Sequence, residues 1–166
     1  MKYRHLGNSG LEVSVIGLGT NNFGGRMEFK EARAVIFSAL DQGINLIDTA
    51  NIYSHGRSEE IIGRALTDRR QESLIATKFG MVWEDGPHGH GGSRKHIMDS
   101  LEGSLRRLQT DHVDLYQMHQ QDPDTPIEET LRALDDAVSS GKVRYIGLSN
   151  FDPWRIADAQ WTAIHH

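Results

Sequence analysis

The feature of the sequence that most restricts its fold is a regular alternation of short apolar runs with single amphipathic helical patterns. Strands that are joined by single helices favour a parallel sheet, because parallel neighbours require a long crossover connection. The runs are apolar throughout rather than alternating, which is typical of strands with both faces covered. The pattern predicts an α/β fold with strands in the runs SVIGLG, INLID, SLIATK, HVDLYQMH and RYIGLSN.

Helical signals separate these runs. Residues 32–40 and 97–108 each carry apolar side chains at helical spacing. The segment Thr125–Glu128 predicts a helix start with a capping threonine and a proline at the first helical position, and Gly141 predicts the end of that helix. A further helix is expected to start at Asp152–Pro153.

The amino-terminal residues show a different pattern. YRHLGNSGLEVSVIG predicts a β-hairpin, because Gly7–Gly10 suits a tight turn and Val13 and Val15 alternate with polar neighbours. No linker-like or low-complexity segment divides the 166 residues. Residues 1–166 are therefore predicted to form a single domain.

Polar side chains stand where the strands are expected to end. Asp48, Lys78, His119 and Asn150 occupy four of these ends, and Tyr53 lies in the loop after Asp48. Because parallel strands place their carboxyl ends on one side, we expect these groups to converge there, where barrels and open parallel sheets bind ligands. Each residue alone has an ordinary explanation, such as a turn, a helix cap or a core histidine. Their occurrence at successive strand ends favours a functional site.

The spacing of the strand ends favours a barrel over a doubly wound sheet. The ends recur every 28 to 41 residues, and eight such units approach the roughly 250 residues of a (β/α)8 TIM barrel. Gly17 and Gly19 could begin a G-x-G-x-x-G motif, but Asn22 stands in place of its third glycine. The chain supplies only about five units after its hairpin. We therefore expect an incomplete barrel, the amino-terminal portion of a larger protein, with open outer strands that favour a homo-oligomer.

Composition argues against several classes of function. The net charge of −5, with both signs interspersed, argues against a nucleic-acid partner. No apolar run approaches the ~18 residues of a membrane helix, and the amino terminus is too polar for a secretory signal, so a cytoplasmic location is expected. The sequence has no cysteine, which excludes disulfides and thiolate metal sites. His88 and His90 have metal-like spacing without a third ligand nearby, and no metal is predicted.

An aspartate, a tyrosine, a lysine and a histidine together suit protonation of a carbonyl oxygen while another group attacks its carbon. A tyrosine has a pKa of about 10, and lowering it to about 7 requires about 4 kcal/mol. One ammonium group about 4 Å away supplies about that amount at an effective dielectric constant of about 20. No serine elbow for acyl transfer is visible. The set therefore favours carbonyl chemistry over acyl transfer.

Several separated motifs resemble the aldo-keto reductase superfamily. They are DTANIYSHGRSEEIIGRAL, IATKFG, SLRRLQTDHVDLYQMHQQD and GKVRYIGLSNF. The opening residues and the segment GSRKHI resemble the branch that includes bacterial aldo-keto reductases and potassium-channel β subunits. The resemblance runs from about residue 2 to the end. The superfamily's catalytic tetrad falls on Asp48, Tyr53, Lys78 and His119.

This resemblance implies an NAD(P)H-dependent oxidoreductase that reduces aldehydes or ketones, its small-molecule carbonyl substrates, to alcohols. Tyr53 would be the general acid and Asp48 and Lys78 would tune it. His119 would position the substrate, and Trp83, in the glycine-rich segment GMVWEDGPHGHGGS, would form a wall of the substrate pocket.

The resemblance also implies a cofactor site at the strand ends. NADP is the superfamily's usual cofactor, and NAD stays open. Ser149 and Asn150 would hold the nicotinamide carboxamide. The residues implied for the whole cofactor site are Gly19, Thr20, Asn21, Asp48, Ser149 and Asn150.

Two other interpretations stay open. The resemblance to channel β subunits suggests a non-catalytic nicotinamide-nucleotide-binding or regulatory module. His119 favours catalysis, because those subunits carry asparagine at the matching position. The superfamily's later strands carry an aromatic residue that stacks on the nicotinamide and basic residues that bind the adenosine phosphate. The sequence does not contain these strands, so an inactive fragment is the third interpretation.

Overall fold

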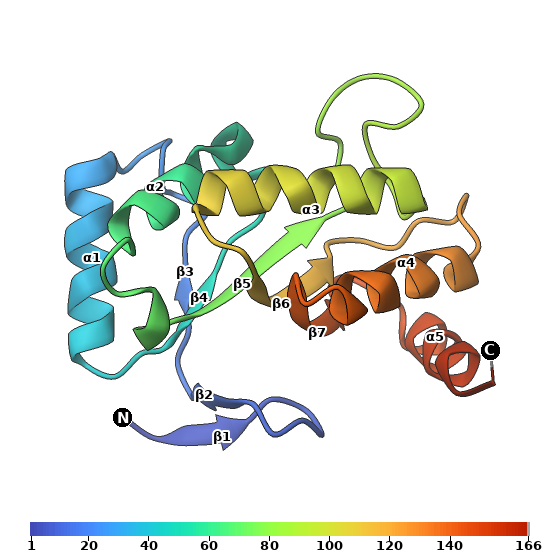
Figure 1. Cartoon of the computed structure of the whole chain (residues 1–166), viewed down its shortest axis with the longest axis horizontal. Coiled ribbons are helices and arrows are strands. Elements are labelled where there is room, and N and C mark those ends of the chain that lie inside the picture. The colour runs from blue at the N-terminus through green and yellow to red at the C-terminus, as the bar shows by residue number, and fades with distance from the viewer. Residues whose placement is uncertain (166) are drawn as a thin grey trace.

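A five-stranded parallel sheet forms the centre of the computed structural model, which describes residues 1–165 (Figure 1). The strands follow one another in space in the order of the chain. The register aligns their carboxyl ends, with Gly19 beside Asp48 and Lys78 beside Gln117. The five predicted strands are confirmed as β3 (Leu18–Gly19), β4 (Leu46–Asp48), β5 (Leu74–Phe79), β6 (Val113–Met118) and β7 (Val143–Leu148).

Within residues 1–165, five α-helices alternate with these strands and cover the sheet as a curved outer layer (Figure 1). Each helix lies beside the next one along the chain, so that α1 contacts α2, α2 contacts α3, and so on to α5. Short 3₁₀ helices, η1 (Tyr53–Gly56) and η2 (Arg70–Glu72), precede and follow α2. The helices are α1 (Phe29–Asp41), α2 (Arg57–Ala65), α3 (Arg94–Leu108), α4 (Ile127–Ser139) and α5 (Pro153–His165).

The sheet is open at both outer strands in the described residues. Within residues 1–165, β3 pairs only with β4, and β7 pairs only with β6. The expectation of strands covered on both faces holds for β5 and β6, which are buried along nearly their whole length. It is wrong for β7, because the face that carries Arg144 and Ile146 is left exposed in the described residues. Self-association through the open edges stays a prediction.

The predicted amino-terminal hairpin is confirmed. Strands β1 (Tyr3–His5) and β2 (Glu12–Ser14) pair antiparallel at one end of the sheet (Figure 1). The backbone N–H of Ser14 donates to the Asn45 side chain at 2.8 Å, and the Tyr3 hydroxyl donates to the Gly43 carbonyl at 2.9 Å. These bonds attach the hairpin to the segment that enters β4.

The start of α4 differs from its prediction. Pro126 is the residue that caps this helix, one position later than expected. The Thr125 hydroxyl donates to an Asp122 carboxylate oxygen at 2.8 Å and makes no capping bond to the helix. The same carboxylate also accepts the backbone N–H of Gly92 at 2.7 Å. The prediction of a capping threonine is therefore wrong, because Asp122 competes for its hydroxyl and ties this turn to the loop before α3.

The hydrophobic core lies between the sheet and the helices. Its largest fully buried members come from every layer, for example Ile36 of α1, Phe79 of β5, Leu101 of α3 and Leu134 of α4. No helix within residues 1–165 has the length and apolar character that crossing a membrane requires.

Replacing Gly63 with alanine should lower the free energy of unfolding by about 1–3 kcal/mol, because extra atoms in a packed contact force backbone shifts. A Cβ at Gly63, on α2, would lie 2.5 Å from the backbone C and O atoms of Leu108 at the end of α3. Urea denaturation of the purified chain measures the change. Gly10→Ala is the control, since a Cβ there meets nothing within 4 Å. Equal stability of the Gly63 variant and the wild type would contradict this close helix contact.

Candidate functional site

Asp48 and Lys78 form an ion pair at the carboxyl ends of the neighbouring strands β4 and β5. The Lys78 ammonium lies 2.5 Å from Asp48 Oδ1 and also donates to the Thr49 carbonyl at 2.8 Å. Lys78 is 6% exposed, whereas the Asp48 side chain is 38% exposed. Gln117, which lies beside Lys78 in the sheet, donates to Asp48 Oδ2 at 3.5 Å. One carboxylate and one carbonyl thereby fix a buried cation at the carboxyl ends of the strands.

Tyr53 reaches this ion pair from the turn that follows β4. Its ring centroid lies 5.3 Å from the Lys78 ammonium nitrogen. The chain then passes through Ser54 and His55 with φ values of 48° and 53°, in the left-handed region that non-glycine residues rarely adopt. Gly56, with φ of 86°, completes the turn and caps α2. The Tyr53 ring thus lies beside Lys78, at the carboxyl ends of the strands.

His119 closes the group from the end of β6. Its imidazole meets the Tyr53 ring edge to face, with 5.8 Å between centroids and 78° between planes. The ring nitrogen Nδ1 is buried and has no hydrogen-bond partner among the described residues. Burial lowers the pKa of His119 below its usual 6.5, the Lys78 ammonium lowers it further, and the Asp48 carboxylate opposes both. His119 is thus neutral at neutral pH.

The titration of His119 should respond in opposite directions to the two charges of the ion pair. Lys78→Met removes a cation that lowers the pKa of His119, so that pKa should rise. Asp48→Asn removes an anion that raises it, so the pKa should fall further below 6.5. NMR of the imidazole C–H signals against pH measures both changes, and Lys95→Met is the control for a distant ammonium. Shifts of the same sign in both variants would contradict this electrostatic arrangement.

The structure therefore brings together the four residues that were predicted as catalytic. They come from the ends of β4, β5 and β6 and from the turn after β4. Gln117 belongs to the same group and was missed by the sequence analysis. Its position on β6, two residues before His119, could have indicated it, because alternate residues along an extended chain point to the same face. The catalytic roles of the four residues stay predictions.

The predicted cofactor residues other than Asp48 lie at the carboxyl ends of the two outer strands, on the same side of the sheet. Gly19 and Asn21 are exposed, whereas Thr20 is fully buried. The Thr20 hydroxyl donates to the Asp48 carbonyl at 2.9 Å and lies 3.0 Å from the Ser58 hydroxyl. Thr20 therefore uses its side chain to hold β3 against β4 and α2.

At the other outer strand, Asn150 has a left-handed backbone with φ of 56°. Its side-chain amide donates to the His119 carbonyl at 2.7 Å and to the Ser149 hydroxyl at 3.1 Å. The Oδ1 atom of Asn150 accepts none of the hydrogen bonds found in residues 1–165, and this side chain is exposed. The acceptor atom Asn150 Oδ1 and the Ser149 hydroxyl thus remain at the rim of the site.

Trp83, the predicted wall of the substrate pocket, packs beside the turn of Tyr53. Its ring stacks on the His55 imidazole at 4.2 Å, and the Arg107 guanidinium lies 4.7 Å from the ring centroid. It lines a hollow of about 480 Å³ between its own loop and α3, together with the buried Asn51. A contact of Trp83 with substrate stays a prediction.

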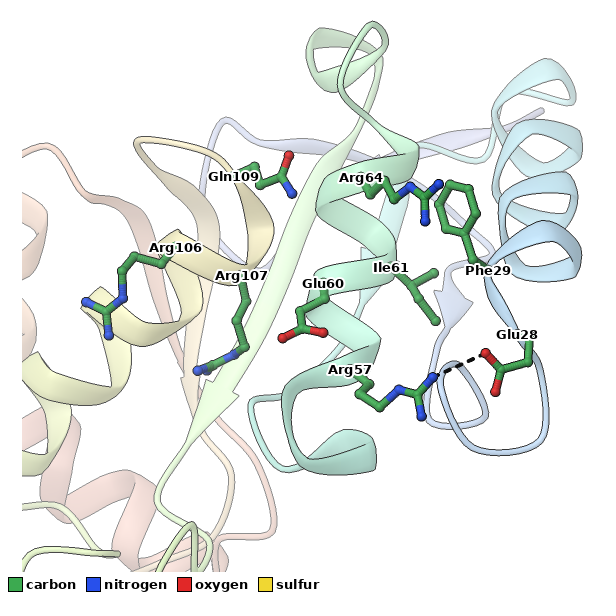
Figure 2. Close-up of a pocket in the computed structure, with 9 residues that line it drawn as sticks. All are labelled: Glu28, Phe29, Arg57, Glu60, Ile61, Arg64, Arg106, Arg107 and Gln109. Carbon is green, nitrogen blue, oxygen red and sulfur yellow. Dashed lines mark hydrogen bonds and ion pairs between the residues drawn. The ribbon is translucent and has the colours of Figure 1, made fainter.

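A second hollow, of about 570 Å³, lies on the outer side of the helices between α2 and the end of α3 (Figure 2). Four arginines and two glutamates line it, and none of the four predicted catalytic residues does so. Glu28 pairs with Arg57 at 3.2 Å across its rim, and the Arg64 guanidinium stacks 3.8 Å from the Phe29 ring. None of its lining residues belongs to the strand-end group, so it is separate from the strand-end site.

Polar residues gather around a buried lysine at the carboxyl ends of a parallel α/β sheet, the side on which barrel folds carry their sites. A sequence profile of the Aldo/keto reductase family matches residues 15–165, and the chain belongs to this family of oxidoreductases. The resemblance found in the sequence is thereby confirmed.

Particular relatives show how much of the family's length the chain represents. It is 44% identical over 157 residues to aldo-keto reductase YhdN of Bacillus subtilis (strain 168), covering 91% of this chain and 47% of that protein. It is 41% identical over 170 residues to a probable voltage-gated potassium channel subunit beta of Oryza sativa subsp. japonica, covering 99% of this chain and 51% of that protein. The chain thus spans about half the length of the curated relatives it matches.

A solved structure supports the same conclusion for the fold. Aldo-keto reductase AKR11C1 from Bacillus halodurans, in its holo form, matches with a TM-score of 0.87 and 41% identity, over 95% of this chain and 53% of that one. The predicted TIM-barrel class is confirmed, with a barrel that is not closed by the described residues.

Proposed function

We propose that this chain carries the proton-transfer machinery of a carbonyl reductase acting on aldehydes or ketones. The proposal rests on the contacts among four side chains at the carboxyl ends of the strands. They are Asp48, Tyr53, Lys78 and His119. A reduced nicotinamide cofactor, when bound, supplies the hydride for the carbonyl carbon. Tyr53 donates the proton to the carbonyl oxygen, so that the product is an alcohol.

Lys78 gives Tyr53 its ability to release that proton. The phenol becomes a phenolate when it donates, and a neighbouring ammonium stabilises this negative charge. Asp48 lies 2.5 Å from the Lys78 ammonium, and this carboxylate offsets the cost of burying a cation. The three groups therefore act as one electrostatic unit.

His119 is suited to orient the carbonyl. A neutral imidazole offers one N–H donor and one acceptor, and its edge-to-face contact with Tyr53 fixes the ring beside the phenol. A carbonyl oxygen held by His119 would thus lie near the proton it receives. Burial and Lys78, which lower the pKa of His119, keep this ring neutral.

The rim of the site fits the polar end of a nicotinamide. A carboxamide has both donors and an acceptor, and Asn150 Oδ1 and the Ser149 hydroxyl can satisfy them. Gly19 and Asn21 on the opposite outer strand would border the remainder of the cofactor, with Thr20 as a fixed support. We propose NADP(H) as the cofactor on the family's usual preference, with NAD(H) as the alternative. Trp83 and His119 are proposed to border the substrate.

Aldehyde-dependent oxidation of NADPH, followed by absorbance and repeated with NADH, tests this function. Quenching of tryptophan fluorescence by each nucleotide is measured in parallel. Quenching and oxidation together support a reductase. Quenching without oxidation would instead favour a nucleotide-binding module, the alternative that similarity to a probable potassium channel subunit beta suggests. Absence of both quenching and oxidation would indicate an inactive fragment.

A further inference from the structure

We infer that Arg107 is a positioning residue that holds the turn of Tyr53 through a stack formed with Trp83 and His55. The inference deepens the proposed function and rests on it, since Tyr53 is there the proton donor. It also assigns Trp83 a task that differs from contact with substrate. Arg107 lies on α3, more than fifty residues from Tyr53 in the sequence, and it is not one of the four residues predicted as catalytic.

The turn that carries Tyr53 needs support from outside itself. Ser54, His55 and Gly56 follow one another in the left-handed region, with φ values of 48°, 53° and 86°. Left-handed backbone is unfavourable for residues with a Cβ, and it persists where the surroundings hold it. The backbone bonds of the turn are all short-range: the Tyr53 N–H donates to the Ala50 carbonyl, the His55 N–H to the Ile52 carbonyl, and the Arg57 N–H to the Ser54 and Tyr53 carbonyls. These bonds do not fix the His55 side chain.

Trp83 supplies the first external contact. Its ring lies parallel to the His55 imidazole, with 4.2 Å between centroids and 5° between planes. Trp83 belongs to the loop between β5 and α3, which projects from one end of the fold (Figure 1). Within this loop its backbone N–H donates to the Gly89 carbonyl at 2.8 Å. The stack therefore joins the loop to the turn of Tyr53.

Arg107 anchors this stack to the core. Its guanidinium carbon lies 4.7 Å from the Trp83 ring centroid, and its Nε donates to a Glu59 carboxylate oxygen at 2.8 Å. Glu59 is fully buried, and its other oxygen accepts the Thr77 hydroxyl at 2.5 Å. A buried, doubly bonded carboxylate can hardly move, so the guanidinium that it binds is a fixed platform for Trp83.

Gly56 shows how closely the anchor fits against the turn. A Cβ at this position would lie 2.7 Å from Arg107 Cδ and 3.2 Å from the Trp83 ring. Figure 2 shows Arg107 lying between α3 and α2, whereas its neighbour Arg106 points away from α2. Arg107 therefore contacts the stack, and the neighbouring Arg106 is suited as the control for its substitution.

Substitution of each arginine in the full chain tests the inference. Arg107→Met should accelerate hydrogen exchange of the backbone amides of residues 53–57 by at least about tenfold, while amides of β5 and β6 stay protected. The kcat for aldehyde reduction should fall about tenfold with little change in KM, because the proton donor is misplaced while binding is kept. Arg106→Met should change neither quantity.

A second pair of variants avoids leaving Glu59 without its partner. Trp83→Leu should accelerate exchange at residues 53–57, Trp83→Phe should restore protection by keeping a flat ring, and Trp154→Leu, on exposed α5, is the control. Unchanged exchange in both Arg107→Met and Trp83→Leu, or acceleration spread evenly over the chain, would overturn the inference. The exchange measurement does not depend on turnover. A chain without reductase activity would refute the proposed function, and hydrogen exchange would still test the role of Arg107 in that chain.

Discussion

Replacing Tyr53 with phenylalanine should reduce the kcat of aldehyde reduction by about 100- to 10,000-fold, the range that a general acid contributes. Phenylalanine keeps the ring that meets His119 and lies above Lys78, but it has no proton to donate. Nucleotide affinity, measured by fluorescence quenching, should stay within about twofold of the wild type, because a single hydroxyl is removed. Steady-state kinetics with NADPH and a generic aldehyde measure the loss.

Tyr145→Phe provides the matched control for this experiment. Tyr145 is a partly buried tyrosine on the outer strand β7, which β6 separates from β5, the strand that carries Lys78. Its loss of a hydroxyl should leave kcat unchanged. Turnover in Tyr53→Phe equal to that of the wild type would show that another group donates the proton.

Replacing Lys78 with methionine should lower kcat by about 100-fold while the chain still folds. Methionine preserves most of the buried volume but removes the charge that lies 5.3 Å from the Tyr53 ring. At an effective dielectric constant of about 20, two unit charges about 5 Å apart interact by about 3 kcal/mol, which corresponds to roughly 100-fold in rate. The same substitution leaves Asp48 without its ion-pair partner.

Lys95→Met tests whether the effect is specific to the site. Lys95 pairs with Asp99 at 2.5 Å on the exposed surface of α3, and such pairs contribute little to stability. Turnover in this variant should equal that of the wild type. A Lys78→Met chain that is as active as Lys95→Met would remove the electrostatic part of the proposed mechanism.

The fold and the convergence of the tetrad residues could be anticipated because both depend on short-range patterns. Apolar runs separated by single helices indicate a parallel sheet, and a parallel sheet brings the ends of its strands together. Asp48, Lys78 and His119 therefore lie on the same side of the sheet, at its carboxyl ends, whatever the details of packing. The family motifs added Tyr53, whose place in a loop gives no periodic signal.

Features that depend on distant parts of the chain could not be anticipated. The left-handed turn at Ser54 and His55 has no glycine at either position, and its support comes from Trp83 and Arg107, which are far away in sequence. The capping role expected of Thr125 fails for a similar reason, since Asp122 binds its hydroxyl. Local rules describe what a residue can do, and the tertiary contacts decide which partner it takes.

Transfer of a label from cofactor to product tests the central claim most directly. The chain is incubated with reduced nicotinamide cofactor deuterated at its hydride position and with a generic aldehyde, and the alcohol is examined by mass spectrometry. The account predicts alcohol that carries the cofactor's deuterium from the wild type, and almost none from Tyr53→Phe. Absence of labelled alcohol from a folded wild-type chain that binds the nucleotide would contradict it.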